Sequence, residues 1–105
     1  MLAWFMLLLA ILLEVSGTLA MKLSDGFSRP WFAVSTVIFY LASFAVLAWV
    51  LKRLEIGIAY AVWAGLGTVL VALLGVVIFQ ESISWIKMVS MSLVVIGVIG
   101  LYLGA

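Results

Sequence analysis

One acidic residue, Glu14, lies inside a long apolar run, whereas the other charged residues lie in or near breaks between such runs. A charge in mid-membrane costs about 2.5–3.5 kcal/mol on insertion scales, so such a residue indicates function by default. Burial favours the neutral form of a carboxyl group. Glu14 can therefore bind and release protons, and when ionised it can bind an organic cation. One residue that does both in turn couples the two ligands by competition. The alternative is a structural Glu that only bonds to a neighbouring helix.

Small residues surround this acid on its own helix face. Ala10, Gly17 and Thr18 stand four residues before, three after and four after Glu14, and these spacings share one side of a helix. They predict a cavity beside the carboxylate. Close packing against another helix is the alternative, because small-residue faces are common membrane interfaces.

Aromatic side chains form a second candidate surface. Tyr60, Trp63 and Gly67 are spaced by three and four residues, so they share a helix face. An indole and a phenol offer cation–π faces and hydrogen-bond donors, although packing alone also explains such a pair. Tyr40 and Ser43 lie along one face of the preceding run.

Glycines and a serine suggest two further roles. Gly65 and Gly67 are expected to let their helix bend, since kinks often occur at glycine. Ser90, Gly97 and Gly100 lie in the last apolar run. We interpret them as a helix–helix contact face.

The elements that position these residues follow from composition. The 105 residues are 70% hydrophobic and 9% charged, which excludes a soluble domain of ordinary composition. About 20 apolar residues cross the hydrocarbon as a helix, and lipid requires backbone groups to bond within the segment. We predict an all-α membrane protein with a single four-helix transmembrane domain, 1–105, and spans at about 2–21, 31–51, 57–79 and 85–103.

Several site types are absent from the sequence. There is no Cys and no His, which removes disulfides, thiol chemistry and ordinary zinc sites. There is no P-loop and no catalytic triad, and a net charge of +1 gives no basic footprint for nucleic acid. We expect neither an enzyme, nor a metal, nor a cofactor.

The loop charges leave the topology open. Lys52, Arg53 and the terminal amine share one side, against Lys22, Arg29 and Lys87 on the other. Because these charges nearly balance, the positive-inside rule does not select an orientation. A single fixed orientation and insertion in both orientations are therefore both allowed. Four helices with one Glu enclose little volume, which predicts at least a dimer.

The chain resembles the small multidrug resistance family of proton-coupled exporters over essentially its whole length. The motifs that carry the resemblance are LEVSGT at 13–18, MKLSDGFSR at 21–29 and GIAYAVWAGLG at 57–67. The resemblance implies an antiparallel, dual-topology homodimer in the bacterial inner membrane. In such a dimer the residue matching Glu14 binds protons and lipophilic cations by turns, and membrane lipid surrounds the protein.

The resemblance also implies roles for other residues. Tyr40, Tyr60 and Trp63 match aromatics that line the pocket, and Ser43 matches a hydroxyl that joins the carboxylate's hydrogen-bond network. Gly65 and Gly67 match the bend that exchanges inward- and outward-facing states. Gly97 matches a glycine of the dimer interface. Ser90 departs from the Gly usual there, and Glu55 stands where Pro is common.

Two positions bear on the subtype. Guanidinium exporters of the family tend to have Gly three residues before the Glu and Trp three residues after it. This chain has Ile11 and Gly17, which resembles the multidrug, quaternary-ammonium subtype. We therefore expect a proton-coupled antiporter of hydrophobic or aromatic cations that works by alternating access. The alternatives are a selective guanidinium exporter and a non-transporting assembly or pore protein.

Overall fold

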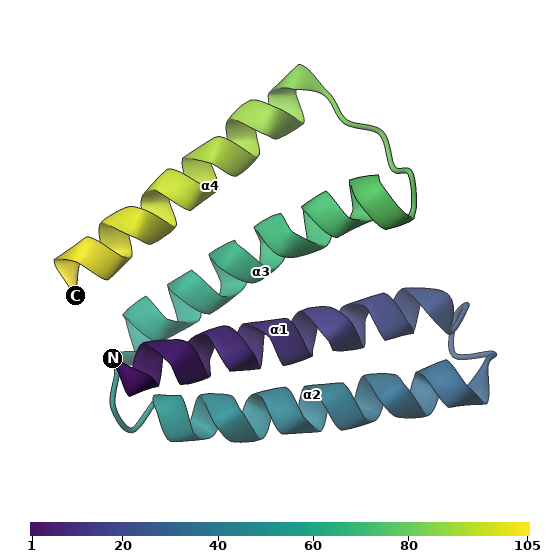
Figure 1. Ribbon diagram of the computed structural model, residues 1–105, viewed down its shortest axis with the longest axis horizontal. Coiled ribbons are helices and arrows are strands. Elements are labelled where there is room, and N and C mark those ends of the chain that lie inside the picture. The colour runs from purple at the N-terminus through teal and green to yellow at the C-terminus, as the bar shows by residue number, and fades with distance from the viewer. The chain divides into compact units, whose positions relative to one another are not determined.

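Four α-helices make up most of the chain. The computed structural model describes residues 1–105. Its helices are α1 (Leu2–Leu23), α2 (Pro30–Val50), α3 (Ile56–Ile78) and α4 (Trp85–Gly104) (Figure 1). All four are long and apolar enough to cross a membrane. The predicted all-α, four-span architecture is confirmed, with helix ends close to those read from the apolar runs. The antiparallel dimer stays a prediction.

The chain divides into two compact units, Met1–Glu55 and Ile56–Ala105. Each unit is a helical hairpin, α1 with α2 and α3 with α4. The assignment of all four helices to one domain stays a prediction.

In the first unit, α1 and α2 lie antiparallel and pack along most of their lengths (Figure 1). The buried positions of α2 are Thr36, Ser43 and Val50. They recur every seven residues, which is close to two helical turns, so they line one stripe. The facing stripe of α1 is formed mainly by small or aliphatic residues, namely Ala3, Leu7, Ala10, Ile11, Val15, Gly17 and Ala20. Small side chains let two helix backbones approach closely in lipid.

The turn between these helices is built around Ser24, which is fully buried. Its Oγ donates to the Met21 carbonyl at 2.6 Å and accepts from the Phe27 N–H at 3.0 Å. The backbone passes through the left-handed region at Asp25 (φ 51°), Gly26 (φ 69°) and Phe27 (φ 66°). Pro30 then opens α2, at a helix position where the missing N–H leaves no bond unmade.

In the second unit, α3 and α4 approach closely at Gly65. A Cβ added to Gly65 would lie 2.9 Å from Val98 Cγ2 and 3.4 Å from Val94 Cγ1. In the 79–84 connection, Gln80 lies in the left-handed region (φ 55°). The connection ends at Ser84, whose Oγ accepts the Lys87 N–H at 3.1 Å and caps α4. None of the residues of α4 is buried.

Candidate functional site

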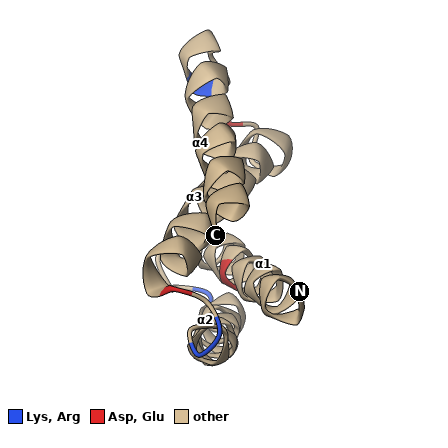
Figure 2. Cartoon of the chain, turned by 90° about the vertical axis from the view of Figure 1, so that its left-hand side faces the viewer, with Lys and Arg blue, Asp and Glu red and all other residues tan.

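Glu14 lies near the middle of α1, whereas most of the other charged residues lie at helix ends or in connections (Figure 2). Its partner on the same helix is Thr18, one turn further on. The Thr18 Oγ1 donates to Glu14 Oε1 at 3.1 Å. The helical spacing of four residues thus places a hydroxyl beside the carboxylate, and the cavity that the sequence indicated there stays a prediction.

Tyr40 brings a second hydroxyl to this position from α2. Its phenolic oxygen lies 2.7 Å from Thr18 Oγ1. Glu14, Thr18 and Tyr40 therefore form one hydrogen-bonded chain that crosses from α1 to α2. Three of the predicted site residues come together in this chain.

Gly17 is the reason that Tyr40 can reach α1. A Cβ at position 17 would lie 2.6 Å from Tyr40 Cδ1, 2.7 Å from its Cε1 and 3.2 Å from Phe39 Cβ. Side-chain atoms do not approach so closely, so any larger residue displaces the ring. Phe44, one turn after Tyr40, continues the aromatic surface with its ring centroid 6.2 Å from that of Tyr40.

Ser43 makes a different contact from the one that the resemblance implied. Its Oγ donates to the Ala10 carbonyl at 2.7 Å, and the side chain is fully buried. The hydroxyl proton is thereby directed to the backbone of α1, one turn before Glu14, rather than to the carboxylate. In this structure Ser43 and Ala10 fasten the two helices together beside the site.

Tyr60 and Trp63 lie one turn apart on α3, in the second unit. Their rings meet edge to face, with centroids 5.4 Å apart and an interplanar angle of 74°. Tyr60 keeps 59% of its surface exposed. The two rings form the continuous aromatic face that the spacing indicated. Their place beside Glu14 stays a prediction.

The predicted bend and interface residues also lie in the second unit. The helix α3 continues through Gly65 and Gly67 without a break, and Gly65 serves as a packing site for α4. A Cβ added to Gly97 or Gly100 would meet no atom within 4 Å, so this face of α4 is open. The bend and the dimer contact stay predictions.

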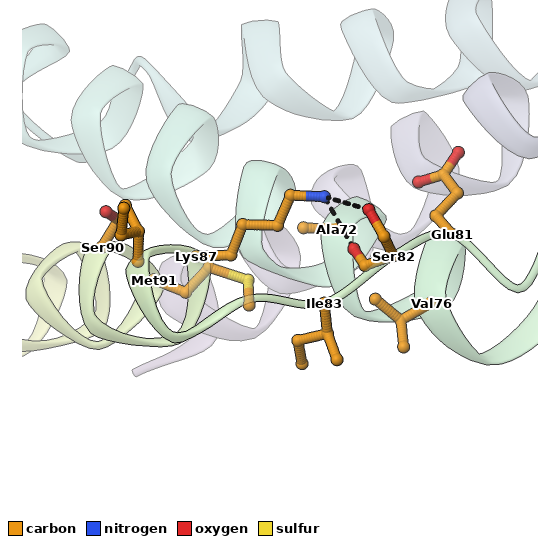
Figure 3. Close-up of a pocket in the computed structure, with 9 residues that line it drawn as sticks. Ala72, Val76, Glu81, Ser82, Ile83, Lys87, Ser90 and Met91 are labelled. Carbon is orange, nitrogen blue, oxygen red and sulfur yellow. Dashed lines mark hydrogen bonds between the residues drawn. The ribbon is translucent and has the colours of Figure 1, made fainter.

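A pocket of about 270 Å³ lies where α3 ends and α4 begins. Figure 3 shows Lys87 reaching over it, with Nζ donating to the Ser82 carbonyl at 2.7 Å and lying 3.4 Å from Ser82 Oγ. The pocket also includes Ser90, which the sequence assigned to helix contact. Its lining is Ala72, Val76, Glu81, Ser82, Ile83, Ile86, Lys87, Ser90 and Met91. No motif in the sequence pointed to this pocket, because it depends on the path of the 79–84 connection.

The fold and the carboxylate within α1 define a small multi-span membrane protein with an ionisable group in one span. The family model described as Small Multidrug Resistance protein matches residues 2–94. The chain is 44% identical over 101 residues to the guanidinium exporter of Escherichia coli (strain K12), a match that covers 96% of each chain. It is 43% identical over 103 residues to the guanidinium exporter of Yersinia pseudotuberculosis, covering 98% of this chain and 99% of that protein.

A third relative is the uncharacterized membrane protein YvaE of Bacillus subtilis, 43% identical over 100 residues, which are 95% of this chain and 84% of that protein. The chain belongs to the small multidrug resistance family of transporters, as the sequence motifs predicted. It is a multi-pass protein of the bacterial inner membrane. The quaternary-ammonium subtype is not confirmed, since the names of these exporters favour the guanidinium alternative.

Proposed function

We propose that this protein is a proton-coupled exporter of small organic cations, with guanidinium-type cations as its first candidate substrates. The observation that carries the proposal is the Glu14 carboxylate within α1, hydrogen-bonded on Oε1 to Thr18, which in turn bonds to Tyr40. Such a group binds either a proton or a cation, and the two ligands compete. Relatives named guanidinium exporter over nearly the whole chain support the substrate class.

The competition supplies the coupling. On the inner side a cation binds the ionised Glu14 and displaces its proton. On the outer side a proton neutralises the carboxylate, which removes the charge that attracts the cation and releases it. Because an unpaired charge in mid-membrane is costly, the occupied forms are the ones expected to exchange between the two faces.

The functional unit in this proposal is an antiparallel homodimer. Two observations support it, namely the nearly equal loop charges on the two sides and the open glycine face of α4. The Tyr60 and Trp63 face would supply aromatic walls to the cation site, and Gly65 with Gly67 would absorb the bend between inward- and outward-facing states.

Quaternary ammonium compounds are the second candidate substrates. The observation that favours them is the pair Ile11 and Gly17, which departs from the pattern of guanidinium exporters. The structure gives this departure a physical meaning, since the Tyr40 ring occupies the space that a Trp at position 17 would need. The two substrate classes are thus supported by different observations.

Transport in proteoliposomes with an imposed pH gradient tests the proposal. Guanidinium and tetraphenylphosphonium are compared as substrates, with Glu14→Gln as the variant that keeps the size of the side chain but not its charge. We expect uptake driven by the gradient in the wild type and background uptake in the variant. Glu14→Asp, the slightly stronger acid, should keep transport and move its pH profile downward.

Two results would contradict the proposal. The first is Glu14→Gln transporting as fast as the wild type. The second is the absence of proton release when either cation is added to the purified protein, which would favour a non-transporting membrane protein. Guanidinium transported in preference to tetraphenylphosphonium identifies the first substrate class, and the reverse order identifies the second.

A further inference from the structure

The direction of the hydrogen bonds between Glu14, Thr18 and Tyr40 follows from a count of protons. An ionised carboxylate only accepts, so the 3.1 Å bond to Glu14 uses the one proton of the Thr18 hydroxyl. Thr18 then has only lone pairs to offer at its 2.7 Å contact with Tyr40. The phenol must therefore donate to Thr18, and its proton is no longer available to a ligand.

We propose that Thr18 is a positioning residue that turns the Tyr40 oxygen into a hydrogen-bond acceptor whenever Glu14 is ionised. The proposal rests on the proposed function and says which cations the ionised site prefers. Because the Tyr40 proton is then donated to Thr18, Glu14 Oε2 and the phenolic lone pairs can both accept hydrogen bonds from a ligand. A cation that carries N–H groups gains from both acceptors, whereas a quaternary ammonium, which has no N–H, gains only the charge attraction.

Protonation of Glu14 reverses the direction of these hydrogen bonds. A neutral carboxyl group can donate its proton to Thr18, and the Thr18 hydroxyl then donates to the Tyr40 oxygen. The phenolic proton is freed to turn toward the ligand, where it opposes an incoming N–H group. The charge of Glu14 and the orientation of the Tyr40 hydroxyl thus change together, and both changes favour release of the cation.

The packing of the first unit holds this chain in place. Tyr40 lies against the bare Cα of Gly17, and the Ser43 bond to the Ala10 carbonyl fixes α2 against α1 one turn away. Tyr40 is the one titratable group of α2, which carries no Asp, Glu, Lys or Arg. On α1 the other ionisable side chain is Lys22, in the last turn. On these two helices, Glu14 is the only carboxylate, so it alone can set the direction of the hydrogen bonds between Glu14, Thr18 and Tyr40.

Equilibrium binding of two matched probes tests the proposal on the full-length protein in lipid nanodiscs. Phenylguanidinium carries N–H groups, and phenyltrimethylammonium has a similar ring and charge without them. We expect Thr18→Val, which keeps the shape but not the hydroxyl, to weaken binding of phenylguanidinium about three- to tenfold, the effect of losing one hydrogen bond. Binding of phenyltrimethylammonium should change less than about twofold, and Thr18→Ser should restore the wild-type preference for phenylguanidinium.

Tyr40→Phe provides a second route that does not depend on the folding of the Val variant. It should weaken phenylguanidinium binding by a similar factor, and adding Thr18→Val to it should weaken binding no further, because the two residues act through one chain. Ser16→Ala is the matched control. It removes a hydroxyl of the same helix that donates to the Leu12 carbonyl at 2.8 Å, and it should leave both probes unchanged.

Equal weakening of both probes by Thr18→Val overturns the proposal, as does a Ser variant that behaves like the Val variant or an additive double variant. These failures differ from failure of the proposed function. If Glu14→Gln binds both probes as tightly as the wild type, the exporter proposal fails as well. If binding depends on Glu14 but Thr18 does not affect the preference between probes, only the present inference fails.

Discussion

The two helical hairpins of this protein, α1 with α2 and α3 with α4, differ in how closely their helices pack against each other. In the first, α1 buries a continuous stripe against α2, and polar side chains bridge the two helices at Ser43 and at Tyr40. In the second, α3 and α4 approach closely at Gly65, and α4 buries none of its residues. Lipid provides no hydrophobic drive for helix association, so small residues and hydrogen bonds must supply it.

The difference separates two tasks. The first hairpin packs within one chain, and it holds the Glu14 carboxylate that we propose as the ligand-binding group. The second leaves the glycine face around Gly97 and Gly100 open, which is the condition for contact with another helix. The proposed site thus lies on the tightly packed hairpin, while the open face of the other hairpin is suited to the proposed contact between chains.

Gly17→Ala should have the largest effect on this comparison, because the added Cβ would overlap the Cδ1–Cε1 edge of the Tyr40 ring. Overpacking of this kind costs about 1–3 kcal/mol, and the displaced ring loses its bond to Thr18. We expect guanidinium transport to fall about tenfold or more, since roughly 1.4 kcal/mol corresponds to a factor of ten. Gly57→Ala, where an added Cβ meets no atom within 4 Å, is the control in the same proteoliposome assay. Wild-type transport by Gly17→Ala would show that Tyr40 does not act at the site.

Gly97→Leu, in the second hairpin, should leave each chain folded but weaken its assembly with a second chain. The open face accepts the larger side chain within the chain, whereas a partner helix packed against that face does not. We expect self-association to weaken roughly tenfold, measured by energy transfer between labelled chains in liposomes. If association is unchanged, the open face of α4 is not the contact surface.

Ser43→Ala should loosen the first hairpin by a smaller amount. Interhelical hydrogen bonds in membranes contribute about 0.6 kcal/mol on average, and up to about 1.7 kcal/mol, and this one is fully buried. The free energy of unfolding in mixed detergent micelles measures the loss. Ser92→Ala is the control, because its hydroxyl donates to the Met88 carbonyl of its own helix. Equal losses in the two variants would mean that the Ser43 bond does not fasten α2 to α1.

Gly65→Ala should have the smallest effect of the four. Its Cβ would lie 2.9 Å from Val98 Cγ2, a methyl group at the end of a side chain that can move by a few tenths of an ångström. We expect an overpacking cost of about 1 kcal/mol to be nearly cancelled by the better helix propensity of alanine, which contributes about 0.8–1.0 kcal/mol, so that the unfolding assay shows little net loss. A loss as large as that of Gly17→Ala would remove the contrast between the hairpins. A loss of transport without a loss of stability would instead support a bend at this glycine.

Helical spacing predicted the part of the site that lies on one helix. Thr18 follows Glu14 by four residues, and the bond between them needs only a regular helix. Tyr60 and Trp63 were placed together for the same reason. The partners from another helix were not predictable in this way. The register of α2 on α1 decides that Tyr40 reaches Thr18 and that Ser43 bonds to Ala10.

The sequence by itself determined four helices of membrane-spanning length and one carboxylate inside the first of them, because lipid admits only apolar segments of about 20 residues with internally bonded backbones. It also determined the transporter family, through motifs along the chain. Only the tertiary structure decided which side chain of α2 is connected to Glu14 by hydrogen bonds. The bare Cα of Gly17 allows Tyr40 to lie across α1, and contacts between helices depend on such local shapes rather than on hydrophobic pattern.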